Sequence, residues 1–147
     1  MRLYLDTCSL NRPWDDQSQV RIHLEAEAVI YIMDAARRGR EAIVSSDYLL
    51  AEIQQITDPV RRADVLALLD PATLHVPQHH SIDTRAQTFA AWHIQGYDAL
   101  HIAAAEAAQC DYLLTTDDRL IRRSTRAGPA LRVKILNPFD YPASSAP

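Results

Sequence analysis

Short hydrophobic runs alternate along this chain with longer segments in which hydrophobic residues recur every three or four positions. The short runs predict strands at residues 2–5, 42–44, 74–76, 112–115 and 132–136. The longer segments predict helices, the first with apolar positions from Ile22 to Met33 and with Gly39 beyond its last turn. Further helices are expected at 46–56, 59–69, from Ser81 toward Gly96, at 97–109 and at 118–127, with a polar loop at 11–18.

Two of these predicted helices carry more specific expectations. Ser81 is expected to cap the helix that it begins, with Ile82, Ala86, Phe89 and Ala90 on the buried face. The helix at 97–109 is apolar nearly all round, so we expect it to be buried on more than one side.

Strands that alternate with helices predict an α/β domain whose mainly parallel sheet is covered by helices on both faces. Ligands bind such sheets in the crevice outside the carboxyl ends of the strands, so chemistry is expected at that edge. Residues 1–138 are predicted to form this one domain. Residues 139–147, which contain prolines and serines, are expected to form a loose tail.

Composition excludes several classes of protein. The formal net charge of −4 argues against a protein that coats nucleic acid through bulk positive charge. The three glycines are isolated, whereas phosphate-cradling loops and dinucleotide sites need clustered glycines. The two cysteines, Cys8 and Cys110, form neither a metal motif nor a disulfide framework. Without a signal-like or membrane-spanning apolar run, cytoplasmic localisation is the expectation.

Two acidic residues end predicted strands. Asp6 follows the run Leu3–Leu5, and Asp117 and Asp118 follow the run that ends at Thr116. If both strands are parallel, Asp6 and Asp117 lie at the same edge of the sheet. A single aspartate there is equally well explained as a turn or cap residue. The pair at equivalent positions shifts the balance toward a functional site.

Two further acids are candidates for the same site. Glu52 lies on the flank of the buried stripe of its predicted helix, although a glutamate there often packs its stem and extends its carboxylate into water. Asp98 begins the most apolar helix, where an aspartate also serves as an ordinary cap. His101 follows one turn later, either as a hydrogen-bonding partner of the site or as a buried, satisfied histidine.

Four carboxylates at one edge would repel each other, at about 4 kcal/mol for each pair 4 Å apart when the effective dielectric constant is near 20. Protons or a divalent cation must neutralise such a cluster. Oxygen ligands select hard cations such as Mg²⁺ or Mn²⁺, and carboxylate-held Mg²⁺ suits phosphodiester hydrolysis.

Weaker candidates surround these acids. Ser9 and Thr115 are candidate hydroxyl partners of the site, and satisfying local backbone groups explains them equally well. Asp118 and Arg119 are candidate substrate or supporting residues next to Asp117. Arg122, Arg123 and Arg126 follow Arg119, but favourable interaction with the helix C-terminus explains them without a ligand.

At these residues the chain resembles the PIN-domain family. The segments that carry the resemblance, in the family's order, are 5–10, 45–52, 98–104 and 114–120. The first resembles the opening hydrophobic-Asp-Thr motif with Asp6, and the second resembles the strand-then-helix glutamate with Glu52. The third is similar to the family's third acid, Asp98, and the helix after it. The fourth resembles the Thr-x-Asp motif, which assigns the fourth acid to Asp117 rather than to Asp118.

The resemblance covers residues 2 to about 138 and implies a fold, an activity and partners. The implied fold is a three-layer α/β/α sandwich with a parallel sheet, and the implied activity is Mg²⁺- or Mn²⁺-dependent cleavage of RNA, in members that are frequently homodimers. Small bacterial single-domain members look like VapC-type toxins, which a cognate antitoxin protein holds inactive. The segment 11–39 is longer than in the most compact members, which bears on substrate selection and on antitoxin geometry.

Other functions fit the residues less well. A phosphatase with an aspartyl nucleophile would carry a second acid two residues after Asp6, where this chain has Cys8. A phospho-receiver domain would need a lysine near the acids, and Lys134 is on the last predicted strand. The alternative from another class is a PIN-like module that binds RNA or protein without cleaving it. All four acidic positions are filled, which favours catalysis.

Overall fold

The computed structural model describes residues 1–142. Its strands are β1 (Arg2–Leu5), β2 (Ala42–Ser46), β3 (Leu74–Val76), β4 (Tyr112–Leu114) and β5 (Lys134–Leu136). Its α-helices are α1 (Thr7–Asn11), α2 (Val20–Arg37), α3 (Asp47–Ile53), α4 (Pro59–Leu68), α5 (His80–Thr88), α6 (Gly96–Ala107) and α7 (Asp118–Ala127). Short 3₁₀ turns are η1 (Arg12–Trp14), η2 (Phe89–Trp92), η3 (Gly128–Ala130) and η4 (Pro138–Asp140).

The sheet has the strand order β3-β2-β1-β4-β5, and every neighbouring pair is parallel. The central strand β1 is paired on both sides, with Tyr4 opposite Val44 and Leu5 opposite Leu114. A central strand covered on both faces should be apolar throughout, and Leu3, Tyr4 and Leu5 are fully buried. The predicted α/β fold with a parallel sheet is therefore confirmed.

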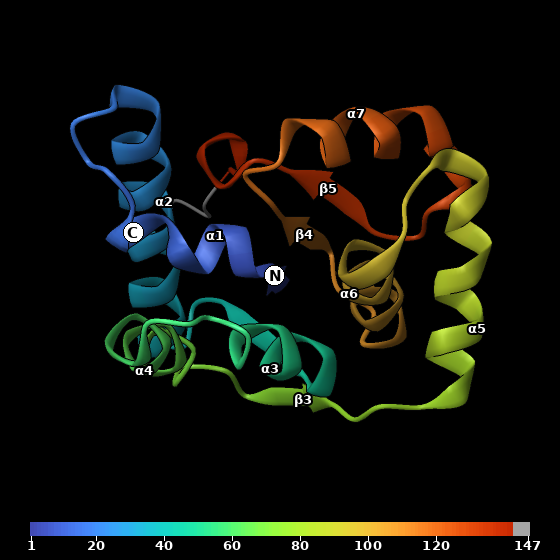
Figure 1. Ribbon diagram of the computed structural model, residues 1–147, viewed down its shortest axis with the longest axis horizontal. Helices are drawn as coiled ribbons and strands as arrows, with labels where there is room; N and C mark the ends of the chain where they lie inside the picture. The colour runs from blue at the N-terminus through green and yellow to red at the C-terminus, as the bar shows by residue number, and fades with distance from the viewer. Residues whose placement is uncertain (143–147) are drawn as a thin grey trace.

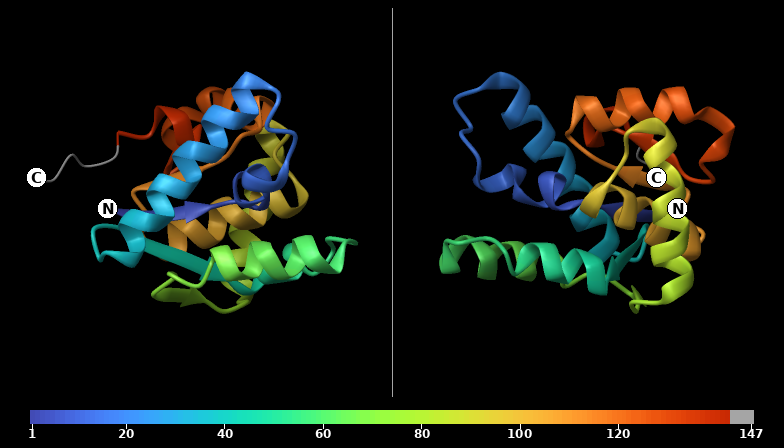
Figure 2. Two further views of the ribbon diagram at one scale, coloured as in Figure 1. Left: turned by 90° about the vertical axis from the view of Figure 1, so that its left-hand side faces the viewer. Right: turned by 45° about the vertical axis from the view of Figure 1, so that its right-hand side comes forward.

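Helices cover the sheet on both sides (Figure 1). The long helix α2 lies on one side of the strands, and α5 and α6 lie on the other. In Figure 2, α2 faces the viewer in the left view, and α7, drawn in orange, runs along the top in the right view. These positions form the three layers that the sequence analysis expects.

Helix α6 is the most deeply buried helical segment on its side of the sheet. It packs against β1, β4 and α5, and its small side chains Ala99, Ala103, Ala104 and Ala105 are all buried. Small residues let the helix backbone approach its neighbours closely while few polar atoms are buried. The expected burial on more than one side is confirmed.

Three local features differ from the expectation. The predicted polar loop is partly helical, because α1 and η1 occupy residues 7–14. His79 caps α5, since its Nδ1 accepts the Ser81 N–H at 3.1 Å, so the predicted Ser81 cap is wrong. Ala90 is exposed rather than part of the buried face.

The chain after β5 is packed rather than loose as far as the structure describes it. Asn137 is buried and donates a hydrogen bond from its side chain to Glu25 of α2. Tyr141 is 6% exposed and donates to Glu41 Oε1 at 2.9 Å. The expected loose tail from residue 139 is thus wrong for Tyr141, and residues 143–147 lie outside the described residues.

No helix within residues 1–142 is long and apolar enough to cross a membrane.

Candidate functional site

Asp6 and Asp117 lie at the same edge of the sheet, where β1 and β4 end side by side. The Asp6 N–H donates to the Leu114 carbonyl at 3.2 Å, which extends the pairing of the two strands by one residue. Asp117 follows two residues after Thr115, whose Oγ1 accepts the Asp117 N–H at 3.1 Å. Parallel strands place their carboxyl ends together, and the structure places both acids there as the sequence predicts.

Asp6 is buried in this edge, with 2% of its surface exposed. Its Oδ1 accepts the Ser9 N–H at 3.0 Å, which makes Asp6 the N-cap of α1. Burial raises the pKa of the Asp6 carboxyl above its usual range, although hydrogen bonds from Thr115 and Ser9 partly oppose that rise. The first acid is therefore held rigidly in a poorly solvated position.

Glu52 is oriented by a buried histidine. His101, 1% exposed, places Nε2 at 3.0 Å from Glu52 Oε1 and Nδ1 at 2.7 Å from the Tyr4 hydroxyl. Burial raises the pKa of Glu52, but hydrogen bonds from His101 and Thr7, together with the interaction with His101, outweigh it, so the pKa lies below its ordinary value. An ionised Glu52 only accepts hydrogen bonds, which assigns a proton to His101 Nε2.

Two members of this network, Tyr4 and Ser46, were not among the site residues predicted from the sequence. The Tyr4 hydroxyl lies 2.7 Å from Ser46 Oγ, and Ser46 Oγ also accepts the Leu49 N–H at 2.9 Å as the N-cap of α3. Hydrogen bonds thus connect β1, the end of β2, α3 and α6. The available signal was a tyrosine inside a central strand, because a buried tyrosine hydroxyl needs a partner.

Asp98 lies in the first turn of α6 and is partly buried. Burial, followed by the negative charges of Asp6 and Asp117 and a smaller effect of Glu52, raises the pKa of Asp98 to about 6. The other three predicted acids therefore all act on Asp98 through space. Asp117 also accepts the Arg119 and Leu120 N–H groups at 2.9 and 3.4 Å as the N-cap of α7, so it serves as a helix cap as well.

This acid cluster, defined as Asp6, Glu52, Asp98 and Asp117, consists of oxygen donors, the type that Mg²⁺ and Mn²⁺ prefer. Within residues 1–142, no group of three or more His, Cys, Asp or Glu side chains is already arranged to hold a metal ion. Burial and the neighbouring carboxylates raise the pKa of Asp98, and a bound cation would favour its ionised form. The donor chemistry of the four side chains fits a hard divalent cation.

The weaker candidates separate into different roles. Ser9 Oγ donates to the Leu114 carbonyl at 2.9 Å, which is the local backbone role that the sequence left open. Asp118 is exposed and turned to α2, where Arg21 donates two hydrogen bonds to it, each 2.7 Å long. The Arg119 side chain is exposed and makes no hydrogen bond or ion pair within residues 1–142.

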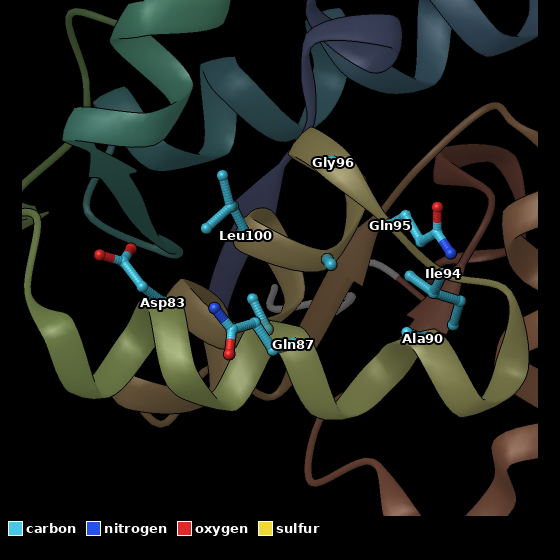
Figure 3. A pocket seen from close by; sticks show the side chains of 9 residues that line it. Asp83, Gln87, Ala90, Ile94, Gln95, Gly96 and Leu100 are labelled. Atoms are coloured by element: carbon cyan, nitrogen blue, oxygen red, sulfur yellow. The ribbon is translucent and has the colours of Figure 1, made fainter.

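A hollow of about 460 Å³ lies between α5 and α6, apart from the acids (Figure 3). Figure 3 shows Gln87 on α5 and Leu100 on α6 beside this hollow, with Gln95 and Gly96 at the start of α6. None of the acid-cluster residues lines it. The hollow therefore plays no part in the site described above.

No family model matches the chain, and no curated protein matches its sequence. Several chains in solved structures share its fold, among them the following two. A chain in the crystal structure of VapBC2 from Rickettsia felis, bound to a DNA fragment from their promoter, aligns with a TM-score of 0.61 over 93% of this chain and 98% of that one, at 14% identity. A chain in the crystal structure of FitAcB from Neisseria gonorrhoeae aligns with a TM-score of 0.59 over 95% and 99%, also at 14% identity.

Proposed function

We propose that this protein is a divalent-cation-dependent endoribonuclease that hydrolyses RNA phosphodiester bonds. The observation that supports this proposal most directly is the position of Asp98. Its carboxyl shares one sheet edge with Asp6, Asp117 and Glu52, and burial and their charges raise its pKa to about 6. An acid cluster of this kind is stable when a cation neutralises it. The resemblance to the PIN-domain family assigns its four acidic site positions to the same residues.

The residues in and around the acid cluster have different proposed roles. Asp6, Asp98, Asp117 and Glu52 would hold Mg²⁺ or Mn²⁺, which when bound polarises a phosphodiester and lowers the pKa of water. Backbone and hydroxyl groups of Ser9 and Thr115 hold Asp6 and Asp117 in place. His101, itself fixed by Tyr4, orients Glu52 and keeps it ionised. Such partners fix the direction of ligand oxygens.

RNA cleavage by the purified protein with Mg²⁺, with Mn²⁺ or with EDTA tests the activity. We expect cleavage with either cation, none with EDTA and none in Asp98→Asn, which keeps the shape of the side chain and removes its charge. Asp64→Asn, a change to an acid outside the cluster, should cleave as wild type does. If Asp98→Asn cut RNA at the wild-type rate, the mechanism would be wrong. RNA binding without cleavage under all three conditions would instead favour the non-catalytic alternative.

We propose further that the chain is the toxin of a toxin–antitoxin pair and forms a homodimer. The resemblance to VapC-type toxins and the fold shared with chains of the VapBC2 and FitAcB structures support this proposal. The net charge of −4 suits a small basic or amphipathic antitoxin segment. Expression alone should slow growth of a bacterial host, and co-expression of an adjacent small reading frame should restore it. If the host grew normally while it expressed an enzyme that cleaves RNA, a role in RNA processing would be favoured over a role as a toxin.

A further inference from the structure

One face of α7 carries a row of arginines that the acid cluster does not use. Arg119, Arg122, Arg123 and Arg126 are spaced three and four residues apart, so they share a helix face and surround a shallow hollow of about 260 Å³. The opposite face of α7 packs into the domain through Leu120, Ser124 and Ala127. We call these four residues the arginine ridge.

The guanidinium groups of the ridge make no hydrogen bond or ion pair within residues 1–142. Asp118, the acid that precedes Arg119 in α7, is bound by Arg21 of α2, and Arg122 acts on it only through its charge. Elsewhere the arginine side chains that donate hydrogen bonds are those of Arg2, Arg12, Arg21, Arg61, Arg62 and Arg85, and Arg38 forms an ion pair with Asp34. Unpaired guanidiniums gathered on one helix therefore distinguish α7.

Helix stability does not explain the ridge. Like charges three or four positions apart destabilise a helix by about 0.2–0.5 kcal/mol for each pair. Cations stabilise the last turn of a helix, yet only Arg126 lies in the last turn of α7. Arg119 and Arg122 lie in its first half, toward the positive end of the helix dipole. The simpler interpretation from the sequence thus accounts for one arginine of the ridge.

The ridge starts beside the acid cluster, because Asp117 is the N-cap of α7. From Arg119 to Arg126 it extends about 10 Å along the helix at about 1.5 Å per residue. Guanidinium groups bind phosphate oxygens through paired N–H donors. A row of such groups leading away from a phosphodiester-cleaving site matches a ligand with regularly spaced phosphates.

We propose that the arginine ridge binds the sugar–phosphate backbone of single-stranded RNA on one side of the acid cluster. The inference rests on the proposed nuclease function, to which it adds the residues that hold the substrate. The ridge contacts phosphates, so it contributes affinity independent of base sequence. This local patch supplies the positive charge that the acidic chain as a whole lacks.

Binding of a fluorescent twelve-nucleotide oligouridylate in EDTA, followed by anisotropy over a series of salt concentrations, tests the ridge. Each phosphate contact contributes about 0.7 to the slope of log affinity against log salt for a single strand. The double variant Arg122→Gln with Arg126→Gln should bind more weakly and lose about 1.4 from that slope. Both residues are exposed, so thermal melts of this variant should match or exceed those of wild type.

A matched control removes two exposed arginines from the other end of the domain. Arg37 ends α2, and Arg40 precedes β2 at the amino edge of the sheet. Arg37→Gln with Arg40→Gln changes the net charge equally and should leave the slope at the wild-type value. A wild-type slope in the ridge variant, or an equal loss in the control, would overturn the proposal. Displacement of the RNA by polyglutamate of equal charge at equal concentration would also overturn it and would indicate an acidic protein partner.

The two proposals fail in different ways. Because the binding experiment contains EDTA, it does not depend on cleavage. A wild-type protein that never cleaves RNA but shows the ridge-dependent slope would refute the nuclease and keep the ridge. A wild-type protein that cleaves RNA with Mn²⁺ while the ridge variant keeps its slope would refute the ridge and keep the nuclease.

Discussion

Asp98 holds its proton to a higher pH in the folded chain than an ordinary aspartate does. Its pKa is about 6 in the fold against an ordinary value of 3.8. Between these values the folded chain binds more protons than the unfolded chain, so the free energy of unfolding falls as pH rises from about 4 to 6. We expect Asp98→Asn to lack this part of the fall, and urea unfolding in EDTA across that range measures it. Identical pH profiles for the two proteins would contradict the raised pKa.

The same residue should control the response to metal. Mg²⁺ or Mn²⁺ that binds only the folded acid cluster should raise the melting temperature, with about 2.7 kcal/mol gained at a hundredfold excess over the dissociation constant. Without metal, Asp98→Asn should melt at or above wild type because repulsion is relieved, and it should lose most of the metal effect. Asp64→Asn and Asp83→Asn should respond as wild type does. If metal left wild type unmoved, the carboxylates would not form a metal site.

At the scale of elements, Asp117 caps α7 and is also proposed to bind metal. Two substitutions at this position distinguish these roles. Asparagine caps a helix as well as aspartate does, whereas alanine costs about 1 kcal/mol at an N-cap. We therefore expect Asp117→Asn to unfold at nearly the wild-type urea concentration and Asp117→Ala at a lower one. Both variants should lose RNA cleavage. If Asp117→Asn cleaved RNA normally, Asp117 would be a cap alone.

The sequence predicted the elements that a repeating hydrophobic pattern defines, and it missed those that polar contacts define. The short apolar runs gave the strands, and the last long helix was predicted at its observed bounds. The five residues of α1 are too few to show a helical period, and its cap is the Asp6 side chain. His79 was missed because a histidine is an uncommon cap beside a serine.

The positions of two acids in the candidate site could be predicted from the sequence, but a contact between two helices could not. Asp6 and Asp117 follow from strand ends in a parallel sheet, a rule that needs only the order of elements. The contact between Glu52 and His101 depends on how α3 and α6 rotate against each other, which a pattern within either helix does not specify. The metal-binding roles of all four acids remain predictions.

At the scale of the whole molecule, the chain beyond the last strand closes against the other end of the sheet. Tyr141 donates to the buried Glu41, a residue 100 positions earlier, and its ring packs edge-on against Tyr112. A hydrogen bond to a charged group contributes about 1.5–3 kcal/mol. Tyr141→Phe should lower the free energy of unfolding by about that amount, measured in urea. Phe139→Leu, at an exposed position, should change little, and an unchanged Tyr141→Phe would show that the tail contributes no stability through this bond.

The central position of β1 has a consequence for the time at which the protein becomes functional during synthesis. Its first partner, β2, is available once residue 46 is made, but β4 follows only at residues 112–114. Contacts between residues so far apart form late and slowly, and the exposed flank of the strand needs protection in the meantime. Asp98 and Asp117, which belong to the same acid cluster as Asp6, are likewise synthesised long after it. A growing chain therefore holds an incomplete set of acids until Asp117 has been made, and a fragment released earlier would lack part of the acid cluster on which the proposed activity depends.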